Sequence, residues 1–95
     1  MKESYDYILI STDIINCSFN AHQYCVFLDI ALRCDRRYKV EAKSLRRELD
    51  TKRSKQALAE IIEKGIIWED EVYLEISDDY KKYIRFAPEE LTEFS

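Results

Sequence analysis

The chain has 95 residues, 46 % of them hydrophobic and 36 % charged, and its single glycine and single proline exclude a low-complexity chain. A chain of this length folds as one domain with a modest core. Its net charge of −4 argues against a uniformly basic nucleic-acid-binding protein, so such an activity depends on how the charges are distributed. No apolar run reaches the roughly 18 residues of a membrane span, and Met1–Asp6 lack the features of a secretory signal, so we expect a cytoplasmic protein.

The first predicted elements are a short strand and a long helix. Tyr5–Ile10 is rich in aromatic and β-branched residues, and the polar Ser11–Asn20 connects it onward. Asn20 and Gln23 have the spacing of a capping box, which predicts a helix from Ala21 to Cys34. Its apolar residues repeat at intervals of three and four, as in a helix buried over much of its circumference: Tyr24, Val26, Phe27, Leu28, Ile30 and Ala31.

Two further helices, separated by a tight turn, follow in the middle of the chain. After a charged turn, the short segment Tyr38–Val40 leads into a helix over Ala42–Leu49. Asp50 or Thr51 can cap a third helix over Arg53–Lys64, which Gly65 ends in the left-handed conformation. The residues expected on the inner faces of these helices are Ala42, Leu45, Leu49, Ala57, Leu58, Ile61 and Ile62.

The remaining sequence predicts a β-hairpin and an ambiguous tail. Ile66–Trp68 and Val72–Ile76 are two β-rich runs on either side of the acidic tip Glu69–Glu71. Asp79–Phe86 fits either an amphipathic helix or a third strand, before Pro88 begins a terminal turn. We therefore expect the hairpin directly after the third helix, and either a helix or a strand over Asp79–Phe86.

The charges are unevenly distributed along the chain. The stretch from Arg33 to Lys64 holds 11 basic and 6 acidic side chains, a local charge of +5. The other residues hold 4 basic and 13 acidic side chains, a charge of −9. The predicted second and third helices therefore form a positive island in an acidic protein.

The order of these elements, together with two motifs, resembles the winged helix-turn-helix superfamily over roughly Ser18–Ser77. The motifs are Val40–Leu49 and Lys55–Ile67, and the second is similar to that family's recognition helix, which ends at a glycine followed by two apolar residues that enter the wing. Tyr7–Leu32 is similar to modules of phage and plasmid replication initiators and regulators. The resemblance implies an α+β fold with a three-helix core and a C-terminal β-hairpin wing. In that single domain, residues 1–17 form an arm, about 18–77 the core and 78–95 an extension.

The same resemblance implies sequence-directed binding of double-stranded DNA by a transcription or replication regulator of phage or mobile-element type. In this fold the third helix reads base edges near its N-terminus and the second helix lies across the backbone. The candidate base-reading residues are Arg53 and Lys55, which can donate to guanine, and Gln56, which suits adenine. The candidate phosphate-binding residues are Arg36, Arg37, Lys43, Arg46, Arg47 and Lys52.

The outer face of the third helix is the surface on which this hypothesis depends. A helical wheel places Lys52, Arg53, Gln56, Glu60 and Glu63 away from the core, with Lys55 on the flank. The alternative is that this surface is merely a solvated helical face.

Three expectations concern partners and the surfaces that bind them. A lone recognition helix buries a modest interface, so we expect a homodimer that reads two half-sites. The acidic hairpin tip would repel phosphates, so the DNA contact should avoid the wing. The candidate protein interface consists of Trp68, Glu69, Asp70, Glu71, Tyr73, Tyr83 and Phe86. The alternative explanation of its aromatic residues is that they cover the core.

Other functions are also considered. The alternative to DNA binding is a protein-interaction winged helix whose acidic wing and C-terminal region bind and inhibit a basic partner such as a nucleic-acid enzyme. We do not expect an enzyme or a cofactor, because His22 has no evident nucleophile partner and the chain lacks a Gly-rich phosphate loop. His22 and Cys25 lie one helical turn apart but lack further ligands to complete a metal site. Cys17, Cys25 and Cys34 contain no C-x-x-C pair and are expected to be reduced thiols.

Overall fold

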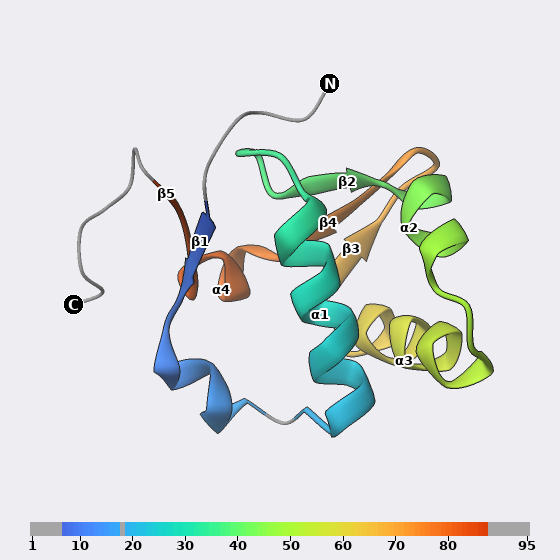
Figure 1. Cartoon of the computed structure of the whole chain (residues 1–95), viewed down its shortest axis with the longest axis horizontal. Helices are drawn as coiled ribbons and strands as arrows, with labels where there is room; N and C mark the ends of the chain where they lie inside the picture. Colours follow the sequence, from blue (N-terminus) through green and yellow to red (C-terminus); the bar gives the residue numbers. More distant parts are fainter. Residues whose placement is uncertain (1–6, 18, 88–95) are drawn as a thin grey trace.

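Helix α1 (Ala21–Arg33) crosses the middle of the domain, and all the other elements lie around it (Figure 1). The computed structural model describes residues 7–17 and 19–87, and within them the fold is a small α+β domain with two antiparallel sheets. The other elements are β1 (Tyr7–Ile10), the 3-10 helix η1 (Thr12–Asn16), β2 (Lys39–Glu41), α2 (Ala42–Glu48), α3 (Lys52–Glu63), β3 (Ile67–Glu69), β4 (Tyr73–Ile76), α4 (Asp78–Lys81) and β5 (Ile84–Ala87).

The helix boundaries follow from local capping chemistry. The Gln23 backbone N–H donates to Asn20 Oδ1 at 2.8 Å, and the Asn20 N–H donates to Gln23 Oε1 at 3.2 Å, so the predicted capping box is confirmed. Thr51 Oγ1 accepts from the Ser54 N–H at 3.0 Å and thereby caps α3. Gly65 follows α3 with φ +79°, the left-handed conformation that favours glycine.

The sheet behind the helices has the strand order β2-β4-β3, and both of its strand pairs are antiparallel. The predicted hairpin is present as β3 and β4. Cross-strand partners share a face, which puts Val40 and Leu74 on the inner side and Trp68 and Glu75 on the outer side. The alternating burial along β4 agrees with this register, since Leu74 and Ile76 are fully buried.

The second sheet joins the two ends of the described chain. Strands β1 and β5 pair antiparallel, with Ile8 opposite Phe86 (Figure 1). The tail, for which the sequence left helix and strand open, contains both: the one-turn helix α4 followed by β5. The described parts of the expected arm and extension are therefore paired with each other through residues 7–10 and 84–87. Pro88, where the sequence predicts a terminal turn, lies outside the described residues.

One continuous core lies beneath α1, α2, α3 and the β2-β4-β3 sheet. Phe27, Ile30, Leu45 and Ile61 are all fully buried there. The core extends beyond the expected limits of about 18–77, because it also includes Ile14, Ile84 and Phe86. Burying these side chains gives the terminal segments the same hydrophobic stabilisation as the rest of the domain.

The turn between α1 and β2 connects the two sheets. Tyr38 has φ +65°, a left-handed conformation that costs a non-glycine residue about 1 kcal/mol. The turn is held by Asp35, which accepts from the N–H groups of Arg37 and Lys39 at 2.8 and 3.2 Å. In this conformation the Tyr38 hydroxyl donates to the Ile84 carbonyl oxygen at 3.3 Å, and its ring packs 5.1 Å from that of Phe86. The turn therefore fixes β5 against the rest of the domain.

Candidate functional site

Helix α2 turns one face to the core and presents basic side chains on the other. Ala42, Leu45 and the following Leu49 are buried, as the sequence predicts. That spacing leaves Lys43 and Arg47 exposed, one helical turn apart. Within the described residues neither of them forms an ion pair with a carboxylate.

Helix α3 continues this arrangement beyond the turn at 49–51, and the two helices lie on the same side of the molecule (Figure 1). Its inner residues Ala57, Leu58 and Ile61 are buried, so Lys52 and Lys55 in the first two turns are exposed. These two lysines also lack a carboxylate partner in the described part of the chain. We call Lys43, Arg47, Lys52 and Lys55 the basic segment.

The remaining candidates on α3 lie on the side that faces the start of α1. Arg53 NH1 is 3.4 Å from His22 Nε2. Gln56 Nε2 donates to Glu60 Oε2 at 3.2 Å, and Gln23 Nε2 donates to Glu60 Oε1 at 2.8 Å. The helical wheel places Glu60 away from the core, and Glu60 does lie outside it. The side chain is nevertheless half-buried, because it bonds to α1, which a wheel of α3 alone does not include.

Arg46 and the acidic hairpin tip are joined to each other. Arg46 NH2 lies 2.6 Å from Glu69 Oε2, so α2 and β3 are connected by an ion pair and Arg46 is not a free cation. Asp70 accepts from the backbone N–H groups of Tyr73 and Val72 at 2.6 and 2.8 Å. These two hydrogen bonds lower the pKa of Asp70 below its ordinary value of 3.8. The tip is therefore an ordered, negatively charged turn.

Arg36 and Arg37 lie in the turn before β2, whereas α2 follows the other end of that strand (Figure 1). The Arg36 guanidinium is 5.7 Å from the centre of the Phe86 ring, and Arg37 forms an ion pair of 3.0 Å with Asp35. Burial alone would raise the pKa of Asp35, but hydrogen bonds from Lys39 and Arg37 hold it below its ordinary value. These two arginines therefore lie at the other end of β2 from the basic segment, and Arg37 is connected to Arg47 only along a groove that both residues line.

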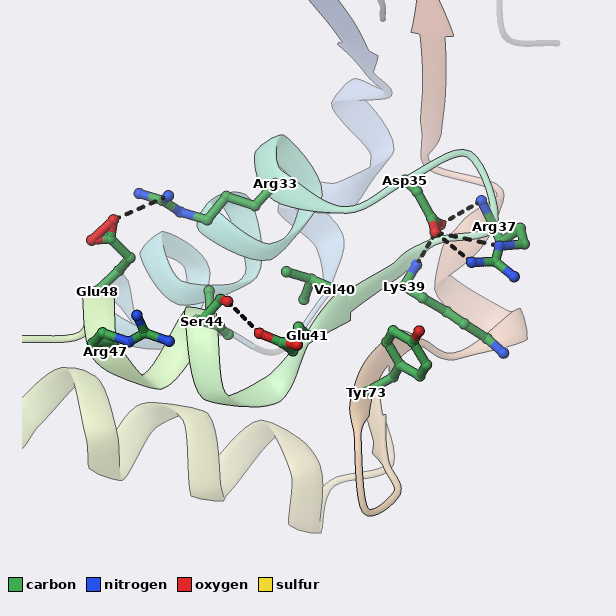
Figure 2. Close-up of a pocket in the computed structure, with 11 residues that line it drawn as sticks. Arg33, Asp35, Arg37, Lys39, Val40, Glu41, Ser44, Arg47, Glu48 and Tyr73 are labelled. Carbon is green, nitrogen blue, oxygen red and sulfur yellow. Dashed lines mark hydrogen bonds and ion pairs between the residues drawn. The ribbon is translucent and has the colours of Figure 1, made fainter. Parts of the chain in front are cut away.

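A groove of about 820 Å³ lies between the end of α1, β2 and α2, and Arg47 lines its α2 side (Figure 2). Its carboxylates already accept hydrogen bonds: Glu48 from Arg33 at 3.4 Å, and Glu41 from the Ser44 hydroxyl at 2.6 Å. Asp35, in the turn described above, lines the same groove. The groove is therefore lined by side chains of both signs: Arg33, Arg37, Lys39 and Arg47 are basic, and Asp35, Glu41 and Glu48 are acidic.

The aromatic residues predicted to form a protein interface separate into two groups. Trp68 and Tyr73 are 45 and 37 % exposed on the outer face of the sheet, beside the exposed Glu71. Phe86 is fully buried and Tyr83 is half-buried, with its ring 5.9 Å from that of Tyr80. The prediction that Phe86 belongs to an interface is wrong, because pairing of β5 with β1 places this side chain in the core.

The described residues offer little for metal or thiol chemistry. They contain no group of three or more His, Cys, Asp or Glu side chains that could hold a metal ion. Cys17, Cys25 and Cys34 form no disulfide bond with one another, and the buried Cys34 donates from Sγ to the Ala31 carbonyl oxygen at 3.3 Å. Nor does the described part of the chain include a helix long and apolar enough to cross a membrane.

Comparison of the chain with protein-family models, with curated proteins and with solved structures found no match. The site is therefore defined by this chain's own geometry. Sequence reasoning missed the link between Gln23 and Glu60, although the capping box placed Gln23 correctly at the start of α1. No local signal pairs residues that are 37 positions apart.

Proposed function

We propose that this protein is a winged helix-turn-helix protein that binds double-stranded DNA in a sequence-directed way. The element order α1-β2-α2-α3-β3-β4 and the strand order β2-β4-β3 support this fold. In such a domain α3 enters the major groove, α2 contacts the backbone, and the β3–β4 hairpin is the wing.

The observation that carries the proposal is the basic segment. Its four side chains, Lys43, Arg47, Lys52 and Lys55, lie on α2 and the first two turns of α3 without a carboxylate partner among the described residues. Cations that are not neutralised within the protein release counterions from DNA when they contact phosphates. The segment thus occupies the two helices that a helix-turn-helix protein uses.

Base reading is assigned to Lys55, Gln56 and Arg53, which lie in the first half of α3. Lys55 and Arg53 donate to acceptors such as guanine O6 and N7, whereas the Gln56 amide offers a donor and an acceptor. The acidic tip Glu69–Glu71 stays away from the phosphates, and the Arg46–Glu69 ion pair holds β3 against α2.

Charge reversal on α3 tests the proposal. The affinity of wild type, Lys55→Glu and Lys82→Glu for a random-sequence DNA duplex is measured by fluorescence anisotropy at two salt concentrations. Lys82 is an exposed lysine after α4, so it controls for the change in net charge. Salt-dependent binding that is lost in Lys55→Glu and retained in Lys82→Glu supports the proposal. Absence of wild-type binding at low salt refutes it.

A second candidate function is binding of a basic protein through the hairpin. The observation that favours it is an exposed apolar group, Trp68, Val72 and Tyr73, next to the acidic Glu71. Aromatic residues surrounded by charges are typical of protein interfaces. In that case Lys55→Glu would leave the activity intact, and Trp68→Ala would remove it. The same apolar group is the proposed contact of a homodimer, which analytical ultracentrifugation of Trp68→Ala would test.

A further inference from the structure

A chain of hydrogen bonds connects the first turn of α1 to the exposed side of α3. From it we infer that Gln23 and Glu60 are positioning residues that orient the Gln56 amide toward the edge of an adenine. The inference rests on the proposed function, because it assigns a base preference to the same helix. Gln56 touches the DNA in this account, and the other two residues act through it.

The chain of hydrogen bonds begins at Gln23, which is 5 % exposed. Its Oε1 accepts from two donors, the Asn20 N–H at 3.2 Å and Lys64 Nζ at 3.1 Å. Neither donor can accept a hydrogen bond in return, so the amide nitrogen has to face the other way. There it donates to Glu60 Oε1 at 2.8 Å.

Glu60 transmits this orientation to Gln56. Its second oxygen, Oε2, accepts from Gln56 Nε2 at 3.2 Å. An ionised carboxylate accepts hydrogen bonds and cannot donate them, so it selects the amide nitrogen of Gln56 rather than the amide oxygen. Gln56 is exposed, and this bond leaves its Oε1 and its second N–H available to a ligand.

An acceptor and a donor on one amide match the N6 amino group and N7 of adenine in the major groove. Without Glu60, the terminal torsion of Gln56 is broad and two-fold, so both amide orientations are populated. Ordering such a side chain on binding lowers the affinity for the preferred sequence by about 3- to 10-fold. Because Glu60 already orients the Gln56 amide in the free protein, most of this ordering cost is absent when DNA binds.

Paired variants separate this role from a general effect of charge. Glu60→Gln and Glu63→Gln each remove one negative charge from the same helix, but Glu63 lies outside the hydrogen-bond chain. Both variants should bind random duplex more tightly, because each removes a charge that repels phosphates. Only Glu60→Gln also breaks the hydrogen-bond chain. Its amide has one acceptor oxygen and one donor nitrogen, so it cannot accept from both Gln23 and Gln56 as the two carboxylate oxygens do.

Gln23 has a second matched pair. Gln23→Ala removes the bond to Glu60 and one half of the capping box, whereas Asn20→Ala removes the other half of the box and leaves Gln23 in contact with Glu60. Asn20→Ala should cost about 1 kcal/mol of helix stability, whereas Gln23→Ala should cost more, because it also removes the bonds to Lys64 and Glu60 from a buried site. DNA binding is therefore compared where urea unfolding shows both variants to be folded. There a positioning role predicts loss of base preference in Gln23→Ala alone, and a merely structural role predicts no loss in either variant.

The experiment is selection of binding sites from a randomised duplex library by wild type and these variants, with Gln56→Ala as reference. We expect wild type to select an adenine at a position where Gln56→Ala does not. At that position Glu60→Gln and Gln23→Ala should lose about 3- to 10-fold of the preference for adenine, and Glu63→Gln and Asn20→Ala should retain it. An unchanged preference in Glu60→Gln, or a base other than adenine at the position that depends on Gln56, overturns the inference.

A measurement on the free protein distinguishes failure of the inference from failure of the proposed function. The side-chain NH₂ signals of Gln23 and Gln56 in nitrogen-15 spectra should both shift in Glu60→Gln relative to wild type, and they should stay in place in Glu63→Gln. Wild type that binds no duplex overturns the proposed function and the base preference together. Amide signals that are insensitive to Glu60 overturn the hydrogen-bond chain even if the protein binds DNA.

Discussion

The salt dependence of DNA binding should report directly on Lys43. On a random duplex no base is read specifically, so Lys55 and Arg53 contact phosphates there as Lys43, Arg47 and Lys52 do. The basic segment and Arg53 thus supply five cations per protomer, and Arg53 has an imidazole rather than a carboxylate as neighbour. Five phosphate contacts give a slope of about −4.5 for log K against log salt, and removal of one contact in Lys43→Ala gives about −3.6. Between 50 and 200 mM salt, wild-type affinity should therefore fall about 500-fold and that of Lys43→Ala about 150-fold.

Anisotropy titrations with one random duplex at several salt concentrations measure these slopes. Lys82→Ala serves as the control, because it removes the same charge from the end of α4 and should leave the slope unchanged. The reasoning would be refuted if Lys43→Ala kept the wild-type slope. It would also be refuted if Lys82→Ala reduced the slope as much, since the effect would then belong to net charge and not to α2.

Three further predictions concern the fold. Phe86→Ala should lower the free energy of unfolding in urea by about 3 to 5 kcal/mol, because the ring is fully buried; a loss below 1 kcal/mol would contradict core packing of β5. Gly65→Ala should lower the free energy of unfolding by about 1 kcal/mol, because φ is +79° at this position; a Cβ would meet nothing within 4 Å, so no steric clash adds to this cost. An unchanged urea midpoint would argue against the left-handed cap. Asp70→Ala should lower the melting temperature at pH 7. Because the pKa of Asp70 is lower in the folded state, its carboxylate stabilises the fold fully above pH 3.8, and this stabilisation is lost as the pH falls through the folded-state pKa. The melting temperatures of wild type and Asp70→Ala should therefore converge in acid. A constant difference across that range would exclude this role of the carboxylate.

The elements that could be predicted from the sequence are those with local signals. The capping box of Asn20 and Gln23, the Thr51 cap and the single glycine mark helix ends within three residues of themselves. The hairpin follows from two β-rich runs around an acidic turn. Such features depend on chemistry between neighbours in the chain, so one sequence is enough to locate them.

Pairings between distant residues carry no such signal. Ile8 lies opposite Phe86, and the periodicity of neither segment identifies the other as its partner. For the same reason the sequence leaves both an interface and core coverage open for Phe86, which is buried. The tail could not be assigned to helix or strand because one turn of α4 precedes β5 within only ten residues, too few for either period to dominate.

The candidate site shows the same division between local and distant information. The exposure of Lys43, Arg47, Lys52 and Lys55 follows from the apolar spacing on their own helices. The ion pair of Arg46 with Glu69 joins residues 23 positions apart, and the half-burial of Glu60 depends on α1. Helical periodicity therefore predicts which side chains are exposed, whereas their partners depend on tertiary packing.

The most direct test of the central claim is to map the surface that touches DNA. Nitrogen-15 backbone spectra of the wild-type protein are recorded during titration with an unlabelled random-sequence duplex. The account predicts shifts concentrated in α2 and the first half of α3, at residues 42–56, with little change at residues 67–76 of the hairpin. Shifts confined to the hairpin, or no shifts at low salt, would contradict it.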